Sequence, residues 1–453
     1  MGGSVREFVG RDGEMNFLKQ YYDKPGSQIV VVYGCKGVGK TRLLREFCRG
    51  KKARYYRARA CSDREQCCQW GSELREQGAS PGKYPDYGEL LTASVVEKET
   101  EKQVFVIDEF HHMLKSGSDF FQKLVDFEEN RLMSRPVMTV LCTSASGWVE
   151  NHLVGRIGSL AAAIGGFLKV RELAFTDLRR LFPEYGLEDS MRIYGILGGF
   201  PGYWMSFHPE LDAEQNIIRN LLSRESRLYG EMEVYLEQEL REPGVYNTIL
   251  TAMARDCNKL NDIYRHTGFS RAKISVYLKN LMELDLAEKV YSYDTEGRSD
   301  TQKGIYRISN PYVKFYFRYL FPNGSLLELL PPEDFYRKKV ADSLDLYVEE
   351  AYRRICREHM GREYRTVGEW LGKTGAIDIV ASDEEGRIGV GACVWARAME
   401  SRDLEWLLFS MKKARIESDD IRLYCEKGFD EALQKKADEA KVRLLGFGKG
   451  KGQ

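Results

Sequence analysis

The residues best suited to chemistry in this sequence form a glycine-rich segment with the pattern G-x-x-x-x-G-K-T. Glycines in this pattern let backbone N–H groups point inward around phosphate oxygens, at the positive end of the helix that follows. Lys40 is expected to reach the β- and γ-phosphates of a nucleotide, and the Thr41 hydroxyl to bind Mg²⁺. A plain turn between strand and helix is the alternative. The residues expected to line this loop are Gly34, Cys35, Lys36, Gly37, Val38, Gly39, Lys40 and Thr41.

Two adjacent acids, Asp108 and Glu109, predict the second half of the same site. They follow the apolar run Gln103–Ile107. A carboxylate at the C-terminal end of a strand lies beside the phosphate loop in an open α/β sheet. Asp108 is therefore expected to hold Mg²⁺ through its water shell, and Glu109 to polarise the attacking water. The alternative is a buried strand that ends in two acids without a catalytic role.

The elements that would position these residues alternate between strand and helix. Gln28–Tyr33 is apolar and β-branched, as expected for a strand buried on both faces of a parallel sheet. Arg42–Cys48 has apolar residues at helical spacing. Further strands are predicted at Arg54–Arg59, Gln103–Ile107, Val137–Cys142 and Val170–Leu173. The sequence thus predicts an α/β P-loop NTPase core over residues 1–174.

Composition excludes several classes of protein. The 453 residues include 68 Lys and Arg and 68 Asp and Glu, so the net charge is zero and does not indicate a polyanionic partner or a membrane surface. The ten cysteines lack paired spacing, and Cys61, Cys67 and Cys68 have no nearby histidine to complete a zinc site. No run approaches the roughly 18 apolar residues of a membrane span. A cytoplasmic protein with reduced thiols and no membrane partner is expected.

A helical lid is predicted over residues 175–238 and a winged helix-turn-helix over residues 239–322. The lid pattern begins at Thr176–Leu181 and is broken by Gly198–Gly202. The winged-helix pattern consists of three short amphipathic helices and a hairpin, Leu286–Tyr293 with Gly304–Ser309.

Charge leaves the partner of this winged helix open between double-stranded DNA and another protein. The stretch from Lys259 to Lys279 carries five bases and one acid, Asp262, which suits contact with phosphates, although the third helix runs on into Glu283 and Asp285. The bases are Lys259, Arg265, Arg271, Lys273 and Lys279. The predicted wing carries the acids Asp294, Glu296 and Asp300 with the bases Arg298 and Lys303. An acidic wing would repel the DNA backbone, which favours a protein-contact or lid-regulating role.

Residues 333–449 predict an α/β domain with the order of a restriction-endonuclease-like, PD-(D/E)XK-like core. A helix at Tyr336–Glu358 precedes strands at Arg365–Trp370, Ala376–Ala381 and Ile388–Trp395. Asp378 lies where such a fold places its first metal ligand. The second ligand and the lysine are missing, because these positions hold Ala392, Cys393 and Val394. One carboxylate cannot build the metal site, so no nuclease activity is expected unless Glu349 or Glu350 supplies the second ligand.

The chain resembles the archaeal-type ATPase family, which also occurs in bacteria and lies on the AAA+/STAND branch of P-loop NTPases. The resemblance rests on FVGRDGE, GCKGVGKT, VFVIDEF, LCTS, GGFPGYW, YRISNPYVKFYFRYLFPN and IDIVASDEEGRIGVGACVW. It implies ATP binding and hydrolysis, and a C-terminal nuclease-like domain of unknown function. The chain departs from the family in that domain, where Ala376 replaces a common acid and ACVW replaces Glu-Cys-Lys-Trp.

The resemblance also implies roles for residues outside the two motifs. The backbone of Val9, Gly10 and Arg11 would touch the adenine, and Pro201 would bring the lid over the base. Ser144 would be the polar sensor between the acids and the γ-phosphate, or an ordinary turn serine. Arg156 is a candidate arginine finger that would act on a neighbouring subunit of a homo-oligomer; a surface or core-capping arginine is the alternative.

The sequence therefore favours a Mg²⁺-dependent ATPase of the AAA+/STAND type, with ATP and ADP as ligands and a nucleotide-driven switch that moves the winged helix. One alternative is a DNA-binding or DNA-remodelling ATPase. A second alternative is a non-hydrolysing, ATP-bound scaffold or partner sensor.

Overall fold

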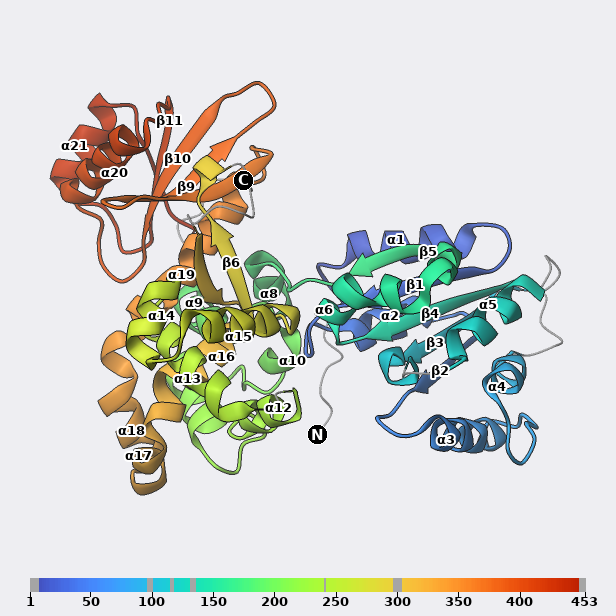
Figure 1. Ribbon diagram of the computed structural model, residues 1–453. Helices are drawn as coiled ribbons and strands as arrows, with labels where there is room; N and C mark the ends of the chain where they lie inside the picture. The colour runs from blue at the N-terminus through green and yellow to red at the C-terminus, as the bar shows by residue number, and fades with distance from the viewer. Residues whose placement is uncertain are drawn as a thin grey trace. The chain divides into compact units, whose positions relative to one another are not determined.

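The computed structural model describes residues 8–95, 101–114, 118–130, 136–239, 242–295 and 304–447. The chain divides into two compact units (Figure 1). The first comprises residues 1–173 with the short segments Phe200–Gly202 and Glu283–Asp285, and the second comprises the rest. Among the described residues, no helix has the length and apolar character needed to cross a lipid bilayer.

The first unit is built on a five-stranded parallel sheet with the order β2-β3-β4-β1-β5. The strands are β1 Gln28–Tyr33, β2 Ala53–Arg57, β3 Gln103–Asp108, β4 Val137–Thr143 and β5 Ile164–Lys169. Every residue of β3 and β4 is buried. This explains their continuous apolar sequences, since a strand covered on both faces has no solvent side for polar residues. The predicted strands at β1 to β4 are confirmed.

Helices cover this sheet and supply the rest of its core. Trp70 of α3 stacks on Tyr56 of β2 with ring centroids 4.7 Å apart, and its other neighbour is Phe105 of β3 at 5.5 Å. The helices are α1 Asp12–Asp23, α2 Lys40–Cys48, α3 Asp63–Glu76, α4 Tyr87–Ala93, α5 Phe120–Asn130, α6 Ser146–Trp148 and α7 Val154–Ile157.

The prediction of a last strand at Val170–Leu173 is wrong, because the edge strand β5 ends at Lys169. Its sequence contains Gly165 and Gly166, which weakened the apolar pattern. The structure gives a reason for a glycine here: a Cβ on Gly166 would lie 2.5 Å from the hydroxyl of Tyr21 on α1. That hydroxyl donates to the Gly165 carbonyl at 2.6 Å. The run after β5 is apolar because Val170 and Leu173 are buried outside the sheet.

The second unit begins with helices and continues into three helices and a hairpin, in the order predicted for a winged helix-turn-helix. The first helices are α8 Phe175–Leu181, α9 Leu187–Leu197, α10 Pro201–Trp204, which starts in the first unit, α11 Ala213–Ile217 and α12 Glu231–Glu239. The next elements are α13 Pro243–Ala254, α14 Leu260–Thr267 and α15 Arg271–Glu283, with the antiparallel pair β6 Ala287–Tyr291 and β7 Gly304–Ile308. The wing residues Glu296, Arg298, Asp300 and Lys303 lie outside the described residues.

The C-terminal part of the second unit contains a mixed sheet with the order β12-β11-β10-β9-β8. Strands β8 to β10 are antiparallel, whereas β10, β11 and β12 are parallel. The strands are β8 Thr366–Leu371, β9 Ala376–Ser382, β10 Ile388–Val394, β11 Asp420–Cys425 and β12 Arg443–Leu445. The helices of this region are α16 Pro311–Phe315, α17 Gly324–Leu329, α18 Pro332–Lys339, α19 Ala341–Met360, α20 Ser401–Ala414 and α21 Glu431–Glu439.

The single helix predicted at Tyr336–Glu358 is wrong, since α18 ends at Lys339 and α19 begins at Ala341. Between them Val340 is fully buried and has φ −112°, outside the helical range. The sequence contained a signal for this end, because three consecutive bases, Arg337 to Lys339, favour the C-terminus of a helix. The proposed boundaries at residues 174, 238, 322 and 333 stay predictions.

Candidate functional site

The glycine-rich segment forms a loop between β1 and α2 in the first unit. Gly37 and Gly39 have φ angles of 85° and 102°, in the region that favours glycine. A Cβ on Gly34 would lie 2.3 Å from the Val170 carbonyl oxygen, so no side chain fits there. Gly39 caps α2 without a side-chain hydrogen bond. The first N–H groups of α2 thus have no capping side chain, which suits an anionic ligand.

Lys40 is buried within this loop. Its ammonium donates to the carbonyl oxygens of Gly34 at 2.6 Å and Cys35 at 3.1 Å. The side chain is only 7% exposed. A buried ammonium requires such partners, and these carbonyls fix its position inside the curl of the backbone. The loop therefore presents a positive charge together with the start of a helix, which is the arrangement that binds phosphates.

Asp108 and Glu109 lie at the C-terminal end of β3, as predicted. Asp108 is 6% exposed, and one of its carboxylate oxygens accepts from the Glu109 backbone N–H at 3.0 Å. The other oxygen accepts a short hydrogen bond from the Tyr55 hydroxyl. Tyr55 on β2 was not predicted as a site residue, because a tyrosine in a strand usually indicates packing alone.

The Glu109 carboxylate is held by the end of β4. One oxygen accepts from the Ser144 backbone N–H at 2.9 Å, the Ser144 hydroxyl at 3.0 Å and the Thr143 hydroxyl at 3.3 Å. Burial raises the pKa of Glu109, but the hydrogen bonds from Ser144 and the charge of Lys40 outweigh it and lower the pKa overall. Glu109 therefore stays ionised, as a proton acceptor must be. The structure brings the predicted sensor Ser144 directly to the predicted base.

A histidine completes this cluster and was missed by sequence reasoning. Nδ1 of His111 lies 2.7 Å from the Thr143 hydroxyl and 3.5 Å from the Glu109 carboxylate. Burial, followed by the neighbouring His112, lowers the pKa of His111 to about 4, although Glu109 opposes the shift. The ring is thus neutral at pH 7. Its position two residues after the acid follows no recognised spacing, so only the fold reveals it.

The N-terminal segment contacts the loop through a side chain rather than through backbone alone. Val9 is buried, Gly10 has φ 68°, and Arg11 is 5% exposed. The Arg11 guanidinium donates to the Val38 carbonyl within the loop and to the Arg171 carbonyl, both at 2.8 Å. The adenine contact predicted for this segment stays a prediction.

The predicted residue Pro201 also lies against the loop. Within the first unit, the Gly202 N–H donates to the Gly37 carbonyl at 3.2 Å. Pro201 lies 3.6 Å from the place that a Cβ on Gly39 would take. Arg156, in contrast, is exposed, and its Nε donates to the Leu114 carbonyl at 3.0 Å. Its role as an arginine finger for a neighbouring subunit stays a prediction.

Thr41 and Asp108 could take part in binding Mg²⁺. They offer a hydroxyl and a carboxylate, and Mg²⁺ at nucleotide sites uses one or two protein oxygens with waters and phosphates for the rest. Within the described ranges, no group of three or more His, Cys, Asp or Glu residues could hold a metal ion by itself. The residues present thus fit a metal bound together with a nucleotide.

The nuclease-like position in the second unit has a different chemistry. One oxygen of Asp378 lies 3.0 Å from Nε of Arg353, and the other accepts from the Cys393 N–H at 3.0 Å. The two acids that could have supplied a second ligand are also paired, Glu349 with Arg353 at 2.9 Å and Glu350 with Lys314. A guanidinium thus neutralises the carboxylate that a metal would otherwise bind.

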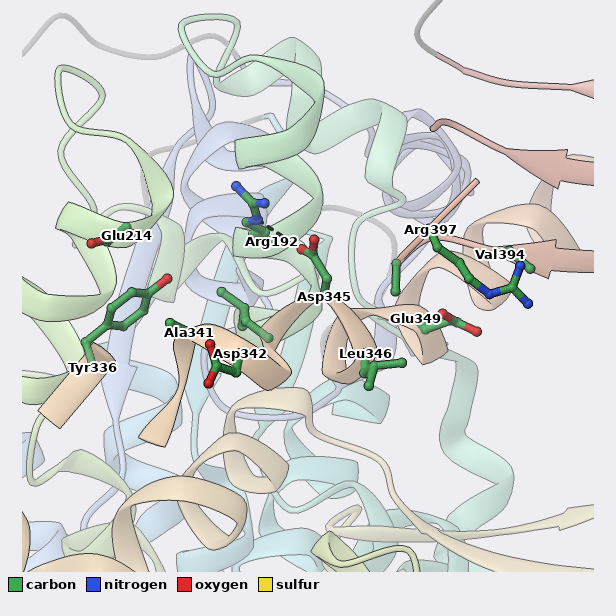
Figure 2. Close-up of a pocket in the computed structure, with 12 residues that line it drawn as sticks. Arg192, Glu214, Tyr336, Ala341, Asp342, Asp345, Leu346, Glu349, Val394 and Arg397 are labelled. Atoms are coloured by element: carbon green, nitrogen blue, oxygen red, sulfur yellow. Dashed lines mark hydrogen bonds and ion pairs between the residues drawn. The ribbon is translucent and has the colours of Figure 1, made fainter. Parts of the chain in front are cut away.

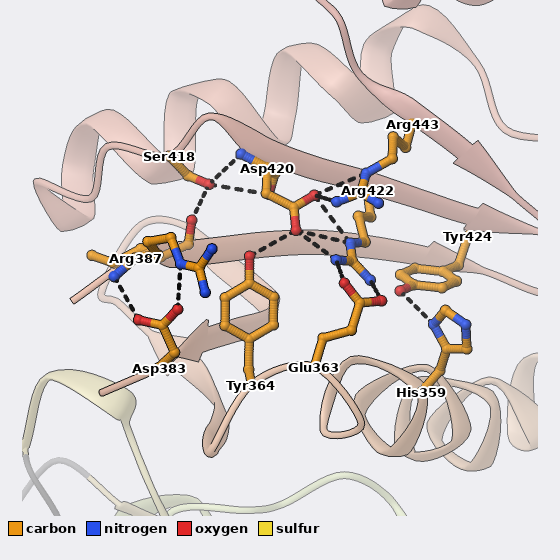
Figure 3. Close-up of polar contacts among 11 residues, drawn as sticks. His359, Glu363, Tyr364, Asp383, Arg387, Ser418, Asp420, Arg422, Tyr424 and Arg443 are labelled. Carbon is orange, nitrogen blue, oxygen red and sulfur yellow. Dashed lines mark hydrogen bonds and ion pairs between the residues drawn. The ribbon is translucent and has the colours of Figure 1, made fainter. Parts of the chain in front are cut away.

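Two further polar regions of the second unit consist of paired charges. A cavity of about 710 Å³ includes Glu349 and Val394 in its lining, and its Asp345 lies 3.2 Å from Arg192 (Figure 2). Asp345 also pairs with Lys427 at 2.8 Å. Around β11, the buried Arg422 pairs with both Asp420 and Glu363 at 2.6 Å (Figure 3). Such pairs fix strand and helix positions, and neither region matches a recognised catalytic arrangement.

The first unit has the fold and the loop of a P-loop ATPase core of the AAA+ type. Residues 24–145 match the family described as AAA domain, and residues 316–406 match the family described as archaea bacterial proteins of unknown function. The resemblance to archaeal-type AAA+ ATPases with a C-terminal domain of unknown function is confirmed by these matches.

Similarity to individual proteins extends over most of the chain. An uncharacterized protein of Methanocaldococcus jannaschii is 24% identical over 415 residues, which are 88% of this chain and 89% of that protein. The Walker-type ATPase PABY2304 of Pyrococcus abyssi aligns with a TM-score of 0.50 at 17% identity, over 70% of this chain and 99% of that one. The ORC2 protein of Aeropyrum pernix gives 0.48 at 15% identity, over 75% and 97%. The Pyrococcus abyssi structure supports the fold alone.

We predict that the nuclease-like domain does not cleave DNA. Hydrolysis in such a fold requires two acidic ligands to hold Mg²⁺, whereas the Asp378 carboxylate is paired with Arg353. The measurement is plasmid and oligonucleotide cleavage with Mg²⁺ and Mn²⁺, for the native protein and for Asp378→Ala. Both should be inactive. Cleavage by the native protein that disappears in Asp378→Ala would contradict the prediction.

Proposed function

We propose that the protein is a Mg²⁺-dependent ATPase whose nucleotide site lies at the C-terminal edge of the parallel sheet in the first unit. The observation that carries this proposal is the convergence of three groups at that edge. A buried ammonium, Lys40, lies inside the phosphate loop. Asp108 and an ionised Glu109 lie at the C-terminal end of the buried strand β3, which β4 separates from β1, and the Lys40 charge contributes to the lowered pKa of Glu109. These are the groups that phosphoryl transfer to water requires.

Each residue has a distinct task in this proposal. Lys40 and the loop N–H groups bind the β- and γ-phosphates and stabilise the charge that develops there. Mg²⁺, held with the help of Thr41 and Asp108, supplies charge neutralisation between the phosphates. Glu109 accepts a proton from the attacking water at its other carboxylate oxygen, because the oxygen that Ser144 and Thr143 contact already accepts three hydrogen bonds. Ser144 orients that carboxylate, and its role as a sensor of the γ-phosphate stays a prediction.

The loop also offers a route by which the nucleotide state can reach the second unit. Gly202 donates to the Gly37 carbonyl inside the loop. The segment Phe200–Gly202 is continuous in the chain with α9 on one side and with the remainder of α10 on the other. We propose that binding and loss of the γ-phosphate shift this contact, so that the nucleotide drives a conformational switch of the lid and winged helix.

A second candidate function is DNA binding through the winged helix. Five basic residues of this module are exposed. They lie on α14, on α15 and at the position before α14: Lys259, Arg265, Arg271, Lys273 and Lys279. Arg271 lies over the ring of Tyr264 at 4.3 Å, and Lys273 over that of Phe269 at 4.7 Å. Such contacts hold long side chains in place. The proposal includes two alternatives to test. One is a protein partner at this surface. The other is a homo-oligomer in which Arg156 acts on the next subunit.

The central prediction separates binding from hydrolysis. Glu109→Gln should retain ATP and slow its hydrolysis by on the order of 10²-fold or more, because the amide cannot accept the proton. Lys40→Ala should weaken ATP binding itself, since it removes the ammonium that lies inside the curl of the loop backbone. The measurements are nucleotide affinity and steady-state phosphate release. Glu76→Gln, an exposed position on α3, is the matched control.

Two outcomes would redirect the proposal. Equal affinity and turnover in Lys40→Ala would contradict the site itself. Binding of ATP without hydrolysis by the native protein, with or without DNA, would favour the non-hydrolysing scaffold or partner sensor.

A further prediction concerns the pH dependence of hydrolysis. The Ser144 hydroxyl and N–H both lower the pKa of Glu109, so Ser144→Ala removes one of these two donors. The pKa of Glu109 should then rise, and the acid limb of the pH–rate profile should move to higher pH. Ser144→Thr keeps the hydroxyl and should leave the limb near its original position. An acid limb at the same pH in Ser144→Ala would show that this contact does not act on the base.

The DNA-binding candidate is tested by salt dependence. If the winged helix binds duplex DNA, affinity should fall steeply with salt, and Arg271→Ala with Lys273→Ala should reduce the slope by about one unit for each lost phosphate contact. Lys412→Ala with Lys413→Ala, an exposed pair on α20, is the control. Absence of duplex binding at low salt, with and without ATP, would favour a protein partner.

A further inference from the structure

The Tyr55 side chain extends from β2 to the end of the neighbouring strand β3, where the predicted magnesium ligand Asp108 lies. It belongs to β2, which pairs in parallel with β3, and its backbone partner in register is Val106. Side chains on a strand lean along the strand direction, and this places the Tyr55 hydroxyl on Asp108, two residues beyond Val106. The hydroxyl donates to the carboxylate oxygen of Asp108 that does not accept from the Glu109 N–H.

The carboxylate that this hydroxyl contacts is almost fully buried. Asp108 is 6% exposed, and a buried carboxylate requires hydrogen-bond donors for its oxygens. Tyr55 lies on β2 and Asp108 on β3, so one of these donors comes from a different strand than the acid itself.

We propose that Tyr55 is a positioning residue of the magnesium site, whose hydroxyl orients the Asp108 carboxylate toward the water shell of the metal. This inference rests on the proposed function, because the metal enters with the nucleotide. Tyr55 does not itself contact the reacting atoms. It acts through Asp108, as the outer partners of metal-binding carboxylates do.

The geometry around Asp108 explains why such a donor matters. A carboxylate on a strand end can turn about its last torsion, which has a broad preference. The Glu109 N–H holds one oxygen and the Tyr55 hydroxyl holds the other, so the plane of the carboxylate is fixed at both ends. Each oxygen retains a second lone pair, which remains available to a metal-bound water. Without the hydroxyl, one of these two contacts would be lost.

The adjacent tyrosine provides an internal comparison. Tyr56 points to the opposite face of the sheet, because successive side chains of a strand alternate. Its hydroxyl lies 3.0 Å from the side-chain oxygen of Gln66, and its ring stacks on Trp70. Tyr56 is thus a core residue whose hydroxyl bonds to Gln66, away from the site. Tyr55→Phe and Tyr56→Phe remove the same atom from consecutive positions of one strand.

The experiment measures Mg²⁺ affinity rather than turnover. A fluorescent ADP analogue is bound to the full-length protein, and Mg²⁺ is titrated from an EDTA-treated state while nucleotide retention is followed. Tyr55→Phe should weaken the apparent Mg²⁺ affinity by about 10- to 100-fold, the range seen when an outer partner of a metal ligand is removed. Nucleotide affinity in EDTA should be unchanged, because the loop and Lys40 are intact. Tyr56→Phe should behave as the native protein does.

The remaining outcomes distinguish this inference from the proposed function. Unchanged Mg²⁺ affinity in Tyr55→Phe would overturn the positioning role. Tighter Mg²⁺ binding would also overturn it, since the hydroxyl would then compete with the metal. A native protein that retains the nucleotide equally with and without Mg²⁺ would overturn the magnesium site itself. In the Asp108→Ala background, Tyr55→Phe should have no further effect, because a residue that acts through Asp108 has nothing left to orient.

Discussion

Backbone carbonyls of the phosphate loop accept hydrogen bonds from the Lys40 ammonium. This close approach of the backbone requires positions without side chains, and that constraint organises the first unit. Gly34 packs against the Val170 carbonyl, where a Cβ would approach to 2.3 Å. The outward carbonyls of the same loop accept from Arg11 at Val38 and from Gly202 at Gly37. Segments that are far apart in the sequence are therefore held by one short stretch of backbone. A residue with a side chain at Gly34 would disturb all of these contacts together.

The sequence was most informative where one physical requirement fixes several residues at once. Strands buried on both faces must be continuously apolar, so β1, β3 and β4 were predicted within one residue of their observed ends. The loop glycines and the acids at the end of β3 were predicted because a phosphate site in such a sheet requires these residue types at these places, and the structure brings them together. The AAA domain match covers this region.

The sequence was least informative where contacts depend on side chains from different elements. His111, Thr143 and Tyr55 contact the acids through torsions and strand register that no spacing encodes. The edge strand β5 was predicted too late in the sequence, because Gly165 and Gly166 weaken its apolar pattern. Tyr21 packs where a side chain at Gly166 would lie, which explains the glycine there. In the second unit, the loss of the usual metal ligands was visible in Ala392 and Val394. The ion pair between the Arg353 guanidinium and Asp378, at the position predicted for a metal ligand, could be seen only in the structure.

The backbone of Glu109 has an evolutionary consequence. Glu109 has φ 53°, a left-handed conformation that costs a residue other than glycine on the order of 1 kcal/mol, and that asparagine and aspartate adopt more easily. Drift at this position toward glycine or asparagine would relieve that cost and remove the proton acceptor in one step, while Lys40 and the loop stayed intact. On the proposed function, a single substitution would thus yield a protein that still binds nucleotide and does not hydrolyse it.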